Sequence, residues 1–227
     1  MRDRNIRFFS AMLKKGDYCL DIGANRGEVA YYISKSVGNS GKVICFEPIA
    51  KTREFLADTI KKFDLTNVII CPNALGSKNE NASMFVPIIA GVNRLALAHI
   101  YKYNKSTNMV GNPILNGTFE NVNMLTLDCA MEILKLNKLD FIKCDAEGYE
   151  FEILDGAEKT VHKYKPLIFV EIWAAKFLNV EHFKKLNYFL KRFNYEIKIL
   201  FDGELKDIDI DLIKKNGIQD YFLTPKK

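Results

Sequence analysis

The sequence predicts an α/β protein with a doubly wound, mostly parallel sheet and helices on both of its faces. Short runs rich in β-branched and aromatic residues alternate with segments whose apolar residues recur at helical spacing. The strand-like runs are almost continuously apolar, as expected for strands that are buried on both faces. A glycine-bearing turn follows the first of these runs, and ligands bind at such turns in open parallel sheets.

The predicted elements follow one another in a regular order, except in the middle of the chain. We expect strands at 18–23, 42–47, 67–72, 139–146, 166–173, 195–200 and 220–224, and helices at 28–37, 48–63, 149–161 and 180–193. The rhythm breaks between 73 and 138, where 87–117 shows no clear period. Long irregular segments in a compact domain often form lids or binding loops. The chain therefore reads as one domain, 1–227, with a substrate-binding insert around 77–127.

The composition is that of an ordinary globular protein, with 48% hydrophobic and 27% charged residues in 227. The net charge of +5 is spread along the chain, so it permits nucleic-acid binding without implying it. The five cysteines lack the two-residue spacing of a zinc site or redox pair, which favours a reduced, cytoplasmic protein. No apolar run is long enough for a membrane span, and the sequence sets no oligomeric state.

The stretch DIGANRG, residues 21–27, raises three alternatives: a phosphate cradle for a dinucleotide, a cradle for another adenosine-bearing cofactor, or only a tight turn. Gly23 and Gly27 permit unusual backbone angles and close approach by a ligand. The dinucleotide fingerprint needs a further glycine between them, and its absence argues against a nicotinamide dehydrogenase. Glu47, which closes the second strand in CFEP, offers a carboxylate to ribose hydroxyls. The segment NALG, 73–76, is a candidate wall for an adenine ring.

A second informative stretch, IKCDAEGYEFEILDGA, places carboxylates after the fourth predicted strand. Asp145 and Glu147 can favour a cationic cofactor and can take a proton from a hydroxyl nucleophile, and Glu171 ends the next strand. A helix cap is the alternative interpretation of Asp145, and Glu150 and Glu152 are expected to be first-turn helix charges. A hard-cation site built from the first three carboxylates lacks a fixed ligand spacing, so no metal is predicted.

These motifs, in this order, resemble the FkbM family of class I S-adenosylmethionine-dependent methyltransferases. The matching segments are DIGANRG, CFEP, NALG, LTLD, IKCDAEGYEFEILDGA and KPLIFVEIW, between about residues 17 and 173. The resemblance implies a Rossmann-like, seven-stranded sheet whose last strand runs antiparallel, and S-adenosyl-L-methionine as the cofactor. It implies cofactor contacts at Asp21, Gly23, Ala24, Asn25, Gly27, Glu47 and Pro48, and at Asn73, Ala74 and Leu75.

The resemblance also implies O-methylation of a small-molecule or glycan acceptor, because substrates in the family include sugars and macrolide-type natural products. A hydroxyl needs a base to take its proton, and we expect Asp145 to be that base or its orienter, with Glu147 and Glu171 as alternates. Two other functions stay open. One is a methyltransferase of RNA or another nucleic acid, although no nucleic-acid partner is expected. The other is a non-catalytic interaction domain on the same fold.

Overall fold

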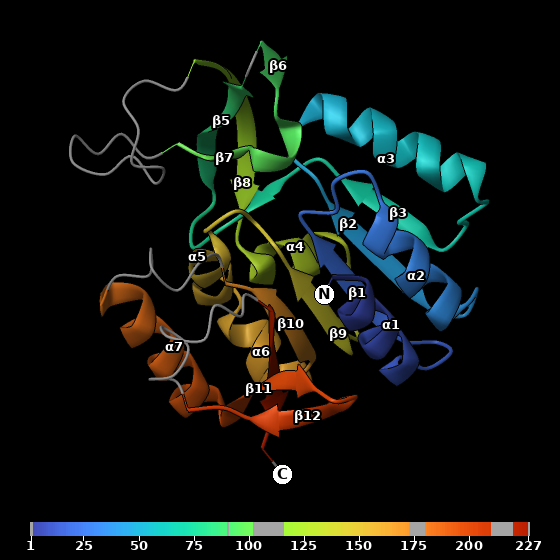
Figure 1. Ribbon diagram of the computed structural model, residues 1–227, viewed down its shortest axis with the longest axis vertical. Coiled ribbons are helices and arrows are strands. Elements are labelled where there is room, and N and C mark those ends of the chain that lie inside the picture. Colours follow the sequence, from blue (N-terminus) through green and yellow to red (C-terminus); the bar gives the residue numbers. More distant parts are fainter. Residues whose placement is uncertain (1, 90, 102–115, 173–179, 210–219, 227) are drawn as a thin grey trace.

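The computed structural model describes residues 2–89, 91–101, 116–172, 180–209 and 220–226 (Figure 1). Strands of the described chain form a main sheet whose spatial order is β12 (Glu204–Asp207), β11 (Tyr195–Phe201), β13 (Asp220–Pro225), β10 (Leu167–Glu171), β9 (Phe141–Cys144), β1 (Tyr18–Ile22), β2 (Lys42–Phe46) and β3 (Val68–Cys71). The five strands from β10 to β3 pair in parallel. The predicted α/β architecture with a mostly parallel sheet is therefore confirmed.

Helices cover both faces of this sheet (Figure 1). One face packs against α1 (Arg2–Met12), α2 (Glu28–Val37) and α3 (Ala50–Lys62), and the other against α4 (Leu127–Ile133), α5 (Glu150–Asp155), α6 (Glu158–Tyr164) and α7 (Val180–Phe193). Alternate residues of β1 enter the two cores, Cys19 on the α1–α3 side and Leu20 on the other. Burial on both faces explains why the strands are apolar throughout. No helix in the described ranges is long and apolar enough to cross a membrane.

The expected count of seven strands is wrong, because the main sheet has eight within the described residues. The last strand, β13, does run antiparallel to β10, as expected. The extra strand is β12, which pairs antiparallel with β11 through a two-residue turn at Asp202 and Gly203. Both turn residues have positive φ, 51° and 82°, which is the backbone of a type I′ hairpin. Asp-Gly is a strong hairpin signal, so the sequence carried this information.

The single helix predicted over 149–161 is also wrong, since α5 ends at Asp155 and α6 begins at Glu158. The break lies at Gly156, where an added Cβ would fall 2.0 Å from the carbonyl oxygen of Gly76. The α6 N-terminus is capped from another helix. Both carboxylate oxygens of Asp128, in α4, accept hydrogen bonds from α6: one from Lys159 N–H at 3.0 Å, the other from Thr160 N–H at 2.8 Å.

The middle of the chain forms a second, smaller sheet at the carboxyl edge of the main one (Figure 1). It comprises β4 (Ala74–Leu75), β8 (Gly117–Leu125), β5 (Glu80–Ile89) and β6 (Val92–Asn93), with β7 (His99–Ile100) also paired to β5 and the short helix η1 (Leu95–Leu97) between β6 and β7. Ile49, Met84, Val122 and Met124 form a separate apolar core beneath it. Part of the predicted insert, 102–115, and the end of the strand predicted at 166–173 lie outside the described residues.

Removal of the cap on α6 should destabilise the fold measurably. We expect Asp128→Ala to lower the free energy of unfolding by about 1–2 kcal/mol, because two backbone N–H groups and the Thr160 hydroxyl lose their acceptor. Urea denaturation measures this difference. Asp58→Ala, at an exposed position of α3, is the matched control and should change stability by less than about 0.5 kcal/mol. Equal effects of the two substitutions would contradict the capping role.

Candidate functional site

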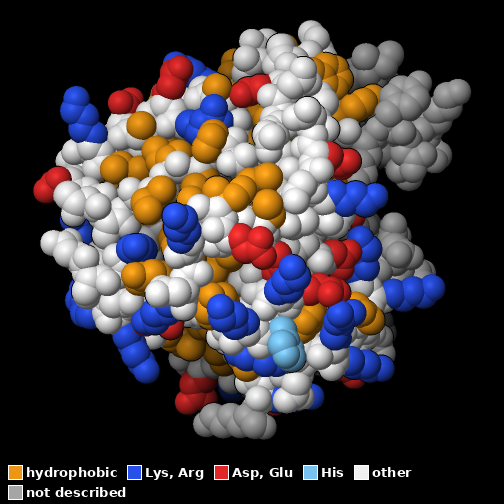
Figure 2. All heavy atoms as spheres, turned by 180° about the vertical axis from the view of Figure 1, so that it is seen from behind, with side chains coloured by type: hydrophobic (Ala, Val, Ile, Leu, Met, Phe, Trp, Pro, Cys, Tyr) orange, Lys and Arg blue, Asp and Glu red, His pale blue; other side chains and the backbone are white. Residues whose placement is uncertain are grey.

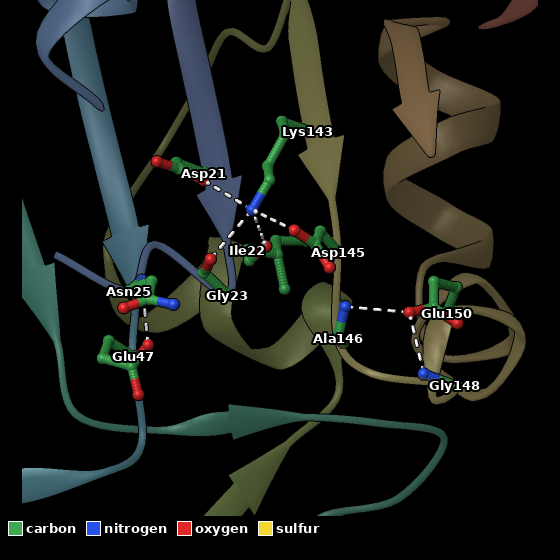
Figure 3. A network of polar contacts seen from close by, with 10 residues as sticks. All are labelled: Asp21, Ile22, Gly23, Asn25, Glu47, Lys143, Asp145, Ala146, Gly148 and Glu150. Atoms are coloured by element: carbon green, nitrogen blue, oxygen red, sulfur yellow. Dashed lines mark hydrogen bonds and ion pairs between the residues drawn. The ribbon is translucent and has the colours of Figure 1, made fainter. Parts of the chain in front are cut away.

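Three loops meet beyond the carboxyl ends of β1, β2 and β9, at residues 23–27, 47–49 and 145–149 (Figure 3). Because parallel strands end at the same edge of a sheet, loops that are far apart in sequence become neighbours there. Gly23 N–H and Ala24 N–H both donate to the Phe46 carbonyl, at 3.0 and 3.2 Å, and Asp145 N–H donates to the Ile22 carbonyl at 3.2 Å. The backbone itself therefore joins the three loops.

The first loop needs glycine at two positions for different reasons. Gly23 has φ +71°, and an added Cβ would lie 1.9 Å from the carbonyl oxygen of Asp145. Gly27 has φ +84° and begins α2, where an added Cβ would lie 2.7 Å from a methyl carbon of Leu56. Gly23 thus permits close packing of two loops, whereas Gly27 permits close packing of α2 on α3. Ala24, 4% exposed, shapes the loop through its bond to the strand-end carbonyl.

Glu47 is buried, with 6% of its surface exposed, at the end of β2. One carboxylate oxygen accepts a hydrogen bond from Asn25 N–H at 2.9 Å, and the other accepts one from Ile49 N–H at 3.0 Å. Burial raises the pKa of this carboxyl, while the two backbone donors and the charge of Lys143 oppose that rise. A carboxylate has about four acceptor sites. Glu47 therefore retains acceptor capacity for two adjacent hydroxyls, such as those of a ribose.

These loops line a cleft that encloses about 650 Å³ of empty space, part of it open to solvent. The predicted cofactor residues that line it are Gly23, Asn25, Glu47, Pro48, Asn73, Ala74 and Leu75. Asp21, Ala24 and Gly27 do not line it: Asp21 and Ala24 are buried, and Gly27 packs against Leu56 of α3. The sequence did not single out six further residues that line the cleft, although the first five lie within the expected insert 77–127: Met84, Leu95, Ala96, Ala98, Ile100 and Tyr149. Most of these come from the small sheet and its short helix.

A buried lysine, to which the sequence analysis gave no role, lies at the centre of this edge (Figure 3). Lys143 Nζ lies 3.1 Å from the carbonyl oxygen of Ile22 and 2.8 Å from that of Gly23. It also pairs with Asp21 at 3.2 Å and with Asp145 at 3.5 Å. Lys143 on β9 lies opposite Asp21 on β1, and Asp145 follows two residues later, on the same face. The sheet geometry therefore brings the three charges together.

The structure separates the three candidate catalytic carboxylates. Asp145 and Glu147 both line the cleft, and Glu147 has φ +50° in the sharp turn that it forms with Gly148, φ +93°. Glu171 ends β10, where it lies opposite Asp220 of β13, and it is not among the residues that line the cleft. Among the described residues, no three His, Cys, Asp or Glu side chains are arranged to hold a metal ion.

Glu150 lies in the first turn of α5, as expected, but its side chain is buried, with 2% of the residue exposed. Its carboxylate turns back to accept hydrogen bonds from Ala146 N–H at 2.8 Å and Gly148 N–H at 3.1 Å (Figure 3). Burial raises the pKa of this carboxyl to about 7, helped by the nearby charge of Asp145 and opposed by backbone hydrogen bonds. Glu150 thereby fixes the loop that carries Asp145 and Glu147.

Comparisons with known proteins agree with this architecture. The family model described as the methyltransferase FkbM domain matches residues 21–197. A crystal structure of a methyltransferase FkbM from Methylobacillus flagellatus is similar over 97% of this chain and 47% of its own, with a TM-score of 0.59 and 16% identity. A SAM-dependent methyltransferase from Aquifex aeolicus is similar over 97% of this chain and 87% of its own, with a TM-score of 0.51 and 15% identity.

A curated relative matches over a shorter stretch. A protein-L-isoaspartate O-methyltransferase of Methanococcus aeolicus is 43% identical over 71 residues, which are 31% of this chain and 33% of that protein. The chain thus spans about a third of that relative in the aligned part, and less than half of the FkbM structure. The family model confirms the expected methyltransferase class, and S-adenosylmethionine is the cofactor expected of that class. Because the family model covers most of the chain, the protein belongs to the FkbM methyltransferase family.

Proposed function

We propose that the protein uses S-adenosylmethionine to methylate a hydroxyl group of a sugar, glycan or natural-product-like small molecule. The observation that carries this proposal is that Glu47 and Asp145 line the same cleft. Glu47 provides an anchor for the ribose of the cofactor, and Asp145 provides a base for the acceptor. Two carboxylates with these separate tasks, on neighbouring loops, are what methyl transfer to a hydroxyl requires.

The cofactor half of the cleft fits an adenosyl group. Beside the Glu47 carboxylate, the side chains of Pro48, Ile49, Ala74 and Leu75 provide an apolar wall for an adenine ring. Gly23 packs closely against the 145–149 loop, so backbone atoms rather than a side chain face the cleft at this point. Next to it, Asp21, Lys143 and Asp145 carry a net charge of −1, which favours a cationic ligand.

The chain itself must position and deprotonate the acceptor. When bound, the cofactor supplies a methyl group that its sulfonium has already activated. The chain must hold the acceptor oxygen in line with that methyl group, exclude water and receive the hydroxyl proton. Asp145 Oδ2 is held by Lys143, which orients the carboxylate as a proton acceptor. Glu147 is the alternate base, and Glu171 is the third candidate to test.

The lining of the acceptor half supports a small organic acceptor. Met84, Leu95, Ala98, Ile100 and Tyr149 give it apolar surface next to the carboxylates, which suits molecules with both hydroxyls and apolar faces. On the described part of the face in Figure 2, Lys and Arg side chains are interspersed with acidic and hydrophobic ones rather than joined in a band. A nucleic-acid groove usually needs such a band.

Transfer of a labelled methyl group tests the proposal directly. The protein is incubated with methyl-labelled S-adenosylmethionine and, separately, with hydroxyl-rich sugars and glycans, polyketide-type alcohols, RNA, DNA and an isoaspartyl peptide. We expect label in an alcohol acceptor, as an ether that resists mild base. Label in RNA or DNA alone would favour the nucleic-acid alternative, and base-labile label in the peptide would indicate carboxyl methylation. Binding of neither S-adenosylmethionine nor S-adenosylhomocysteine would favour the interaction domain.

Glu47→Ala should abolish most of the thermal stabilisation by S-adenosylhomocysteine. Each hydrogen bond to a charged acceptor is worth about 1.5–3 kcal/mol, so loss of two should weaken binding about 100-fold or more. Thermal-shift titration measures the loss, with each variant compared with its own ligand-free midpoint. NAD is the ligand control, and Glu54→Ala, at an exposed position of α3, is the variant control. An undiminished shift in Glu47→Ala would contradict the ribose anchor.

Asp145→Asn should lower kcat about 100-fold or more, because a positioned base typically contributes that much. The dissociation constant for S-adenosylhomocysteine should change far less, since Asn keeps the size and one acceptor oxygen. Single-turnover kinetics with the acceptor identified above, together with calorimetric titration, separate the two quantities. Glu147→Gln and Glu171→Gln are run in parallel. If Glu147→Gln or Glu171→Gln loses more kcat than Asp145→Asn, that residue is the base instead. Equal losses of kcat and affinity in Asp145→Asn would mean that Asp145 binds the cofactor.

The raised pKa of Glu150 should make stability fall as the pH rises from about 4.5 to about 7. In that range the folded protein holds a proton on Glu150 that the unfolded chain has released, so a rise in pH favours unfolding. Glu150→Gln, which keeps an oxygen acceptor for Ala146 and Gly148, should flatten this part of the profile. Urea denaturation between pH 4.5 and 8 measures it, with Glu132→Gln on the surface of α4 as control. A profile unchanged by Glu150→Gln would contradict the assignment.

A further inference from the structure

The ammonium group of Lys143 lies next to the cleft residues Gly23 and Asp145 and has no role in the expectations drawn from the sequence. We infer that Lys143 is a positioning residue that fixes the glycine loop and Asp145 in one relative arrangement, so that the cofactor cradle and the base are set together. The inference rests on the proposed function in one respect, because it takes Asp145 to be the base.

The contacts of Lys143 reach both parts of the site at once. Two of the oxygens near Nζ are the carbonyls of Ile22 and Gly23, at 3.1 and 2.8 Å, which lie at the start of the glycine loop. Two others are carboxylate oxygens, of Asp21 at 3.2 Å and of Asp145 at 3.5 Å. An ammonium group has three hydrogen-bond donors and no acceptor. It can therefore hold several oxygen atoms together, and none of these oxygens can replace it as a donor.

Burial makes this linkage hard to replace. Only 3% of the Lys143 side chain is exposed, and the values for Asp21 and Asp145 are 0% and 10%. Bulk water therefore has little access to these three groups, and the position of each depends on the positions of the other two. The two loops also touch directly, since a Cβ on Gly23 would fall 1.9 Å from the Asp145 carbonyl. A change in the position of either loop must then move the other.

The opposite ends of the same strands provide a matched comparison. Lys138 lies 3.5 Å from Asp17 and 3.2 Å from Asp140, and it donates to the carbonyl of Gly16 at 3.0 Å. It thus joins two aspartates and a carbonyl, as Lys143 does, at the amino ends of β1 and β9 and away from the cleft. The side chain of Lys138 is 43% exposed, so water molecules can replace its contacts.

A purely structural role for Lys143 would be to neutralise buried Asp21. The double variant Asp21→Asn, Lys143→Met separates this role from positioning, because it removes one charge of each sign and keeps the net charge at −1. If Lys143 only balances Asp21, the double variant should bind ligand as the wild type does. If Lys143 positions the loops, the double variant should regain thermal stability relative to Lys143→Met, yet bind poorly.

Two measurements on Lys143→Met, the double variant and Lys138→Met test the inference. The first is calorimetric titration with S-adenosylhomocysteine. The second is site-resolved amide hydrogen exchange of the ligand-free protein, at Gly23 and Ala24 in one loop and Asp145 and Ala146 in the other. In the double variant we expect affinity to fall at least about tenfold, and exchange to accelerate in both loops together. Lys138→Met should leave the affinity and the exchange of both loops as in the wild type.

Wild-type affinity in the double variant, or faster exchange in only one of the loops, would overturn the inference. If Lys143→Met alone does not fold, amide exchange in the double variant still tests the inference. This measurement needs no ligand. Failure of the wild type to bind S-adenosylhomocysteine would instead count against the proposed function. In that case the exchange comparison between Lys143 and Lys138 variants would still decide whether Lys143 couples the loops.

Discussion

The buried ammonium of Lys143 is the interaction on which the arrangement of the cleft depends. An isolated charge is costly to bury, and here two buried charges, Asp21 and Lys143, lie next to the partly buried carboxylate of Asp145. The cation offsets the mutual repulsion of Asp21 and Asp145, while each carboxylate stabilises the cation in surroundings of low dielectric constant. The cation and the two carboxylates therefore lower the free-energy cost of burying each other. Asp21, which was expected to contact the cofactor, therefore contributes as the buried partner of Lys143.

Charged side chains perform a related task elsewhere along the same edge. Where parallel strands end, their last backbone groups lose the partners that the sheet provided, and buried groups of this kind need new ones. Lys143 donates to the carbonyls of Ile22 and Gly23, while Glu47 accepts from Asn25 and Ile49. Glu150 accepts from the amides of the third loop. The loops are thus held in place by the protein's own side chains, which is the preorganisation that catalysis by positioning requires.

Seven of the eight strands of the main sheet, together with α2, α3 and α7, could be predicted from the sequence because they depend on local patterns, apolar runs and helical spacing. The residues at the strand ends followed from the same reasoning, since the topology of a parallel sheet gathers them. Lys143 could not be placed in this way. Its partner Asp21 is 122 residues away, and only the register of β1 with β9 brings them together. Glu150 was placed correctly in the first turn of its helix, but helix position does not reveal that its carboxylate turns inward. The eighth strand, β12, has a local signal in the hairpin turn Asp202-Gly203, but this strand was not predicted.

The lining of the cleft comes from both sheets. The main sheet provides Gly23, Asn25 and Glu47 through the loops that follow its strands, so their geometry is tied to the core of the fold. The small sheet provides Ala74, Leu75, Met84 and Ile100, and it has an apolar core of its own. Within it, Met84 pairs with Ile100 and both line the cleft, while their neighbours Phe85 and His99 pair with each other and do not. Because side chains alternate along a strand, a one-residue slip of both strands would bring Phe85 and His99 to the cleft. The position of β5 and β7 relative to β8, rather than their register with each other, therefore determines whether the cleft has an aliphatic wall or an aromatic one with a titratable ring.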